Sequence, residues 1–377
     1  MDFKRQTILD SAHTVVIKVG TNVLTGPDGT LEPGQIQGLT EQIHRLRQAG
    51  KKVALVSSGA IGAGIGRLGL KSRPSDLPHL QACAAVGQSF LMRAYEDSLA
   101  RFGIPTAQIL LTAGDFDNRA RYLNVRNTIL TLFEYGCLPI INENDTVSVA
   151  EIRFGDNDTL AALVTNLLQA PLLILLTVVD GMYDSDPGLN PNAKLLSTVS
   201  KIDDSILNQA GESKSPLGSG GMPSKLRAAR LAVTAGEAVL MANGSIPGIL
   251  DSIFSGQEVG TLFLPAEQDM PAWKRWLGWA ARTAGSLTVD SGAREAVRGK
   301  GKSLLPIGIV FVEGAFQKGA VLSIRDQQGK EFARGLCNYS SADIAKIKGM
   351  RTEEIATSLG AIRYEEAIHR DNLVVIE

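Results

Sequence analysis

The chain has 377 residues, of which 44% are hydrophobic and 20% charged, and its formal net charge is −1. This composition is typical of a globular protein, and the balanced charge argues against a general attraction to nucleic acid or to an anionic membrane. The three cysteines lack the close spacing of a disulfide framework or a structural zinc site. The first residues contain no apolar signal core, and no apolar run reaches the roughly 18 residues of a membrane span, so we expect a cytoplasmic protein.

Up to about residue 265, short apolar runs alternate with amphipathic stretches. The apolar runs predict strands over 14–19, 52–57, 106–111, 138–142, 172–177 and 237–242. Apolar residues at helical spacing predict helices over 36–46, 119–135 and 222–236. Strands that alternate with helices are typical of a mostly parallel sheet covered on both faces. We therefore predict an α/β fold, a three-layer αβα sandwich, with its ligands at the carboxyl ends of the strands.

Lys18 lies in the middle of the first predicted strand, within the run VVIKVGTN. Burying an ammonium group without a partner costs several kcal/mol, or lowers its pKa until the group is neutral. Lys18 must therefore either reach water or meet an anion.

The second predicted strand ends in SSGAIGAGIG, residues 57–66. Small residues between a strand and a helix let backbone N–H groups cradle an anion at the helix start, although a tightly packed turn is the alternative. A match to GxGxxG at 64–69 begins too far beyond the strand for a dinucleotide-binding fingerprint.

The stretch 142–168 is unusually rich in acidic and amide side chains near a predicted helix start at about residue 159. The residues of interest are Asp145, Asp156, Asn157 and Asp158. Helix capping accounts for one of them. The remainder indicate a polar site for an ammonium group, a metal or a lysine.

A second glycine-rich segment, GSGGMPSK at 218–225, leads into a helix that carries Lys225. Its glycines permit a close approach of the backbone to a ligand, but the segment is not a Walker A motif. The strand at 172–177 ends in Thr177 and opens into a turn-rich loop. This end of the strand is a weak candidate for contact with a nucleotide.

From about residue 265 the pattern changes. Residues 265–285 contain all three tryptophans and indicate a helical linker. Beyond it, short strand-like runs with glycine turns, including 307–312 and 320–324, predict a small β-rich domain.

Taken together, two lysines, two glycine-rich loops and an Asp/Asn cluster describe a phosphoryl-transfer site without a Walker motif. Such a transfer mainly needs positioning and neutralisation of charge. Each lysine supplies a compact positive charge for phosphate oxygens.

The motifs resemble the amino acid kinase family over essentially the whole chain. They are IKVGTN, VSSGAIGAG, NENDTV, FGDNDTLAALV, DGMYDSDP, GSGGMPSK and EEAIHRDNLVV. The resemblance is to the branch that phosphorylates L-glutamate and carries a PUA domain. It implies a kinase domain over 1–265, a linker over 266–284, a PUA domain over 285–364 and a tail over 365–377.

The resemblance also implies roles for individual residues. Lys18 and Lys225 would be catalytic, with Asp158 aligning them. The residues implied for glutamate binding are Ser58, Asp145 and Asn157. The residues implied for ATP binding are Lys18, Thr177, Val178, Ser219, Gly220, Gly221, Met222, Pro223, Ser224 and Lys225. The family commonly has Asp where this chain has Val178, so a contact with nucleotide there would use the backbone, or the base preference would differ.

The implied reaction transfers the γ-phosphoryl group of ATP, with Mg²⁺, to the γ-carboxylate of L-glutamate in the first step of proline biosynthesis. A carboxylate of ordinary pKa, about 4.3, is ionised at neutral pH and needs no general base. The resemblance further implies inhibition by proline and a homodimer or homotetramer. No protein ligand to a metal is predicted.

Two alternatives stay open. Another member of the family would use acetylglutamate, aspartate or UMP as acceptor. A PUA-type RNA-binding protein is disfavoured, because residues 285–377 hold 13 basic and 12 acidic residues, a net charge of +1.

Overall fold

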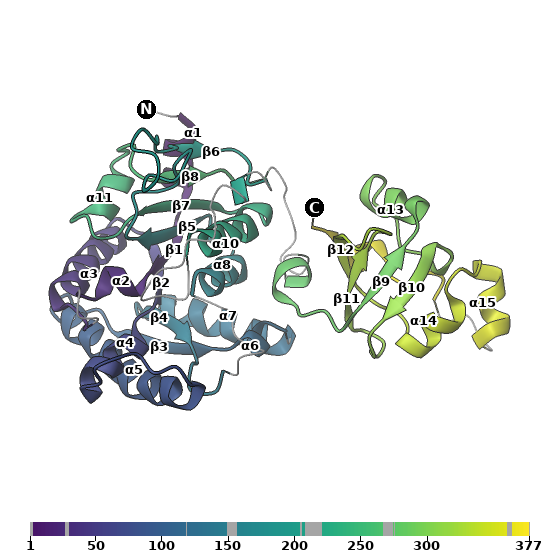
Figure 1. Ribbon diagram of the computed structural model, residues 1–377, viewed down its shortest axis with the longest axis horizontal. Coiled ribbons are helices and arrows are strands. Elements are labelled where there is room, and N and C mark those ends of the chain that lie inside the picture. Colours follow the sequence, from purple (N-terminus) through teal and green to yellow (C-terminus); the bar gives the residue numbers. More distant parts are fainter. Residues whose placement is uncertain are drawn as a thin grey trace. The chain divides into compact units, whose positions relative to one another are not determined.

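The computed structural model describes residues 3–26, 30–117, 119–148, 157–203, 206–207, 221–266, 274, 276–359 and 364–376. The chain divides into two compact units, Met1–Asp269 and Met270–Glu377 (Figure 1). Each unit has its own sheet and its own hydrophobic core.

The first unit is built on an eight-stranded sheet of order β3-β4-β2-β1-β5-β7-β8-β6. Its strands are β1 Thr14–Val19, β2 Lys52–Ser57, β3 Thr106–Leu111, β4 Leu138–Glu143, β5 Leu172–Thr177, β6 Thr198–Val199, β7 Ala238–Asn243 and β8 Thr261–Phe263. All six predicted strands are present, with bounds that differ by at most one residue. Neighbouring strands are parallel except for β7 and β8, which confirms the predicted α/β fold.

Helices lie on both faces of this sheet. They are α1 Phe3–Ser11, α2 Thr21–Leu24, α3 Pro33–Gln48, α4 Ala60–Leu68, α5 Leu77–Ala100, α6 Ala113–Asp117, α7 Arg119–Glu134, α8 Asn157–Leu168, α10 Met222–Thr234 and α11 Ile249–Phe254. In Figure 1, α3 and α5 lie on one side of the sheet and α8 and α10 on the other. The predicted helix near residue 159 begins two residues earlier, at Asn157.

The alternation of side chains along β1 decides where Lys18 points. Val15, Ile17 and Val19 belong to the apolar cluster that includes residues of α3, α5 and α11. Because successive side chains of a strand point to opposite faces, Lys18 faces the other layer, where α8 packs against β1.

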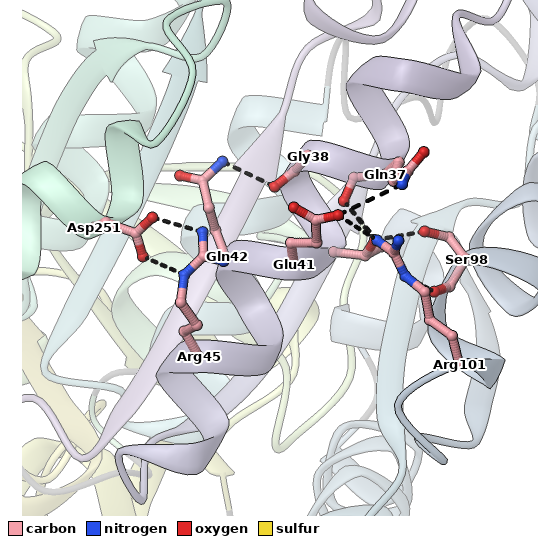
Figure 2. Close-up of polar contacts among 9 residues, drawn as sticks. Gln37, Gly38, Glu41, Gln42, Arg45, Ser98, Arg101 and Asp251 are labelled. Atoms are coloured by element: carbon pink, nitrogen blue, oxygen red, sulfur yellow. Dashed lines mark hydrogen bonds and ion pairs between the residues drawn. The ribbon is translucent and has the colours of Figure 1, made fainter.

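Polar contacts hold α3 in place on its face of the sheet. Arg45 binds both carboxylate oxygens of Asp251 in α11, at 2.9 and 2.6 Å, as Figure 2 shows. Gln42 accepts a hydrogen bond from the backbone N–H of Leu250 at 2.8 Å. On the other flank, Arg101, just after α5, pairs with Glu41 at 2.8 Å. The helix is therefore joined to α5 and α11 by contacts outside the predicted site.

Two glycines allow α4 and α5 to pack with their backbones in contact. A Cβ atom on Gly64 would lie 1.8 Å from the carbonyl oxygen of Cys83, and one on Gly87 would lie 1.8 Å from that of Ala60. Gly64 opens the GxGxxG match, which lies within and just after α4 rather than between a strand and a helix. Its first glycine serves helix packing, in agreement with the rejection of a dinucleotide fingerprint.

The second unit contains a five-stranded sheet of order β10-β9-β11-β12-β13. The strands are β9 Gly285–Val289, β10 Ile309–Glu313, β11 Val321–Arg325, β12 Glu331–Leu336 and β13 Leu373–Val375. Its helices are α13 Ser291–Arg298, α14 Ser341–Ile347 and α15 Thr352–Leu359, and residues 276–280 form a π-helical turn. The predicted small β-rich domain is therefore present.

A search of the described residues finds no helix long and apolar enough to cross a membrane.

Candidate active site

Lys18, Asp158 and Lys225 meet at one edge of the sheet of the first unit. Lys18 Nζ lies 2.6 Å from Asp158 Oδ1, and Lys225 Nζ lies 3.2 Å from Asp158 Oδ2. The three side chains come from β1, α8 and α10 and are 6%, 1% and 11% exposed, respectively. The anion that the buried Lys18 requires is thus a carboxylate of the protein itself, and a second ammonium group shares it.

The two ammonium groups control the charge of Asp158. Burial by itself raises the pKa of this carboxyl group, but attraction to Lys18 and Lys225, with their hydrogen bonds, outweighs burial and holds the pKa below its ordinary value. Asp158 is therefore ionised at neutral pH. Within this trio the positive charges outnumber the negative charge by one, which favours the binding of an anion.

Asn157 lies at the start of α8, beside Asp158, and donates hydrogen bonds to three other residues of the site. Its amide nitrogen Nδ2 donates to Ser58 Oγ at 3.0 Å, to Asn142 Oδ1 at 2.7 Å and to the carbonyl oxygen of Ser57 at 3.3 Å. The sheet brings these residues together, because β2 and β4 are parallel and Val56 pairs with Ile141. The next residues of the two strands, Ser57 and Asn142, therefore lie side by side at the carboxyl edge.

Helix starts add positive potential at this edge. Gly59 precedes α4 with φ +109°, a left-handed conformation that suits glycine, and α4 has no side-chain cap. Gly221 precedes α10, which also has no side-chain cap. Uncapped backbone N–H groups and the helix dipole both favour an anion there.

The other predicted residues fall as follows. Thr177 ends β5 and is buried, while Val178 beyond it is 47% exposed. Asp145 lies in the turn after β4 and is half-buried.

Met222, Pro223 and Ser224 form the first turn of α10 before Lys225, and the hydroxyl of Ser224 is buried without a hydrogen-bond partner among the described residues. Ser219, Gly220 and Asp156 lie outside the described residues, and the role of each of these residues stays a prediction.

Sequence reasoning missed two side chains of α5, Tyr95 and Gln88, that form hydrogen bonds with residues of the site. Tyr95 OH and Ser57 Oγ are 2.9 Å apart, and Gln88 Oε1 accepts a hydrogen bond from Asn142 Nδ2 at 2.9 Å. Burial raises the pKa of Tyr95. Gln88 and Tyr95 are seven residues apart, hence on one face of the helix. The sequence carries no local signal for either side chain, because only the fold brings Asn142 to Gln88 and Ser57 to Tyr95.

Comparisons with known proteins identify the family to which the sequence is similar. The sequence model of the amino acid kinase family matches residues 13–243, and that of the PUA domain matches residues 285–359. A protein of Geobacter metallireducens named "Glutamate 5-kinase" is 50% identical over 372 residues, which is 99% of this chain and 100% of that protein. A protein of Moorella thermoacetica with the same name is 47% identical and covers 98% of this chain and 97% of its own length.

Among solved structures, a UMP kinase of Bacillus anthracis matches 67% of this chain and 96% of its own, with a TM-score of 0.48 and 16% identity.

Proposed function

Because the chain belongs to the amino acid kinase family, we propose that it transfers the γ-phosphoryl group of ATP to L-glutamate, giving ADP and L-glutamyl 5-phosphate. The near-complete match to relatives named glutamate 5-kinase supports this acceptor. The structural observation that carries the proposal is that Lys18 and Lys225 both pair with the buried carboxylate of Asp158. The product is an acyl phosphate, the first intermediate of proline biosynthesis.

The chemistry needs positioning more than proton transfer. An oxygen of the γ-carboxylate forms the new bond to the γ-phosphorus, and the bond from that phosphorus to the bridging oxygen breaks with its electron pair leaving on ADP. The carboxylate is already ionised at neutral pH, so no base has to remove a proton. The difficulty is to bring two anions together, and fixed positive charge in a buried site lowers that cost.

The residues divide this work between them. Lys18 and Lys225 stabilise the charge that builds up on the transferring phosphoryl group, and Asp158 keeps both ammonium groups in register. Ser58, Asp145 and Asn157 hold glutamate. Thr177, Val178 and the segment 219–225 line the nucleotide site, where Val178 contributes its backbone.

Mg²⁺ fits this site as an ion that arrives with the nucleotide. The described residues contain no group of three or more His, Cys, Asp or Glu side chains suited to a metal, and the carboxylate of Asp158 is engaged by two ammonium groups. ATP phosphates and water would therefore supply most of the ligands, as is common for this ion. When bound, Mg²⁺ supplies further neutralisation of phosphate charge.

The remaining expectations complete the proposal. Residues 1–265 carry catalysis, residues 285–364 form the PUA domain, and the protein is a homodimer or homotetramer. Free proline competes with glutamate. The long excursion between Asp145 and Asp156 in the sequence motivates this competition, since it would reshape around either ligand. Glutamate saturation curves that proline leaves unchanged would contradict it.

A trapping assay tests the acceptor directly. The protein is incubated with ATP, Mg²⁺, hydroxylamine and one acceptor, and both ADP and the hydroxamate are measured for glutamate, aspartate, N-acetylglutamate and UMP. We expect γ-glutamyl hydroxamate from glutamate, with ADP formed in equal amount. ADP release with another acceptor and none with glutamate would retain the kinase and overturn the substrate.

A further inference from the structure

We propose that Gln88 in α5 is a positioning residue that fixes the side-chain amide of Asn157, so that only the oxygen Oδ1 of Asn157 is left to meet the substrate. The inference rests on the proposed function, because it concerns the glutamate site. The proposal also places the α-ammonium group of glutamate at Oδ1 of Asn157. Gln88 itself lies two hydrogen bonds away from Asn157, through Asn142, and does not touch the substrate in this proposal.

A backbone N–H group sets the direction of this chain of amides. The N–H of Glu143 donates to Asn142 Oδ1 at 2.9 Å. A backbone nitrogen can only donate, so the oxygen of Asn142 must lie on that side. The amide nitrogen of Asn142 then points to Gln88 and donates to its Oε1 at 2.9 Å. Gln88 is therefore the acceptor that completes the orientation of Asn142.

The orientation of Asn142 in turn fixes that of Asn157. The oxygen of Asn142 can only accept, so Asn157 must present its nitrogen, which donates at 2.7 Å. The same nitrogen reaches Ser58 Oγ and the carbonyl oxygen of Ser57. An amide nitrogen has two hydrogens, and these acceptors of the protein use both.

What remains of Asn157 is an acceptor. Its Oδ1 is buried and has no hydrogen-bond partner among the described residues. An enclosed acceptor without a donor is unfavourable, so a donor from the ligand would satisfy it. Ionised L-glutamate has two carboxylates, which only accept, and one α-ammonium group, which donates. The α-ammonium group is thus the part of glutamate that suits this oxygen.

Gln88→Met tests the proposal, because methionine is similar in size and offers no comparable acceptor to Asn142. We expect the KM for glutamate to rise about tenfold, the effect of one lost hydrogen bond. The kcat and the KM for ATP should stay within about twofold of the wild-type values, since the lysines and Asp158 are untouched. An unchanged KM for glutamate, in an enzyme whose wild type does turn over glutamate, would overturn the role of Gln88.

Gln42→Met is the matched control. Gln42 is a buried glutamine of α3 that donates to the carbonyl oxygen of Gly38 (Figure 2). It also accepts from the backbone N–H of Leu250, and both bonds lie outside the candidate site. Its replacement should lower the melting temperature without raising the KM for glutamate. A rise in KM equal to that of Gln88→Met would mean that the effect comes from loss of stability.

Gln88→Glu separates a positioning role from a packing role. A glutamate side chain keeps an oxygen for Asn142, so this variant should restore the KM for glutamate to within about threefold of the wild-type value. Gln88→Ala removes the acceptor in a second way and carries the same expectation as Gln88→Met. Equal KM values for the Glu and Ala variants would overturn the proposal.

Glutarate, which lacks the amine, tests the assignment of the α-ammonium group. Its inhibition constant should differ less than twofold between wild type and Gln88→Met, because it has no donor for Asn157. A loss of glutarate affinity as large as that for glutamate would contradict the assignment. Failure of the wild type to turn over glutamate would instead overturn the proposed function, so the two failures are distinguishable.

Discussion

Lys18 and Gln88 illustrate at the scale of single residues what a sequence reveals about this site. Lys18 stands out because an ammonium group within an apolar strand requires an anion, and the anion is Asp158. Gln88 gives no such local signal, since an amide on a helix is unremarkable until its partner is known. Its partner Asn142 lies 54 positions away, and only the fold brings the two together.

Asp158→Asn should reduce both stability and turnover. The substitution leaves two buried ammonium groups without their carboxylate, which costs about 3–5 kcal/mol in the free energy of unfolding. The same loss of alignment should lower kcat by about 10²-fold or more. Urea denaturation and the hydroxamate assay measure the two effects.

Asp251→Asn is the control for that prediction. The side chains of Asp251 and Arg45 are 40% and 49% exposed, and an exposed pair contributes at most about 1 kcal/mol. A kcat of Asp158→Asn within threefold of the wild-type value would show that the buried carboxylate does not serve catalysis.

The depressed pKa of Asp158 also predicts a pH dependence of stability. Its folded-state pKa lies below the ordinary value of 3.8, so its stabilising contribution is complete above that value and is lost as the pH falls through the lower, folded value. The difference in unfolding free energy between wild type and Asp158→Asn should therefore be constant from about pH 7 to 5 and shrink below about pH 4. Urea titrations across this pH range measure the difference in unfolding free energy. A difference that grows as the pH falls would contradict this prediction.

At the scale of elements, the strands of the first unit could be predicted because buried parallel strands are continuous apolar runs. The short strands β6 and β8 were missed, since two or three residues carry no periodic signal. Strand order was not predictable either, because it depends on how the helical layers pack. The candidate site needed only the rule that parallel strands end at one edge, which is why its residues could be grouped before their contacts were known.

Gly87→Ala should disturb the contact between α4 and α5. A Cβ atom there would lie 1.8 Å from the carbonyl oxygen of Ala60 and 2.3 Å from the nitrogen of Gly64, both backbone atoms that cannot move alone. We expect a loss of about 2–3 kcal/mol in unfolding free energy and a higher KM for glutamate, since only Gly59 separates α4 from Ser58.

Gly38→Ala in α3 is the matched substitution, because nothing lies within 4 Å of the added Cβ atom. It should stabilise the protein by about 0.5–1 kcal/mol through the better helix propensity of alanine. Thermal and urea denaturation of both variants check the pair, and an equal effect of the two would contradict the packing argument.

At the scale of the whole molecule, the described members of the candidate site belong to the first unit, while the second unit has a separate core and a separate sheet. A chain that ends at residue 266 should therefore fold cooperatively and keep a kcat within roughly tenfold of that of the full protein. Circular dichroism and the hydroxamate assay test this expectation. A truncated chain that folds but has no activity would place an essential contribution in the second unit.

The most direct test of the account is the kcat of Lys18→Met at saturating ATP and glutamate, with glutamate binding measured separately by calorimetry. Methionine preserves the stem of the side chain and removes only the ammonium group that pairs with Asp158. We expect kcat to fall by about 10²- to 10³-fold while glutamate still binds, because the lost group stabilises the transferring phosphoryl group. A kcat within about threefold of the wild-type value, with the variant folded, would contradict the assignment of this lysine to phosphoryl transfer.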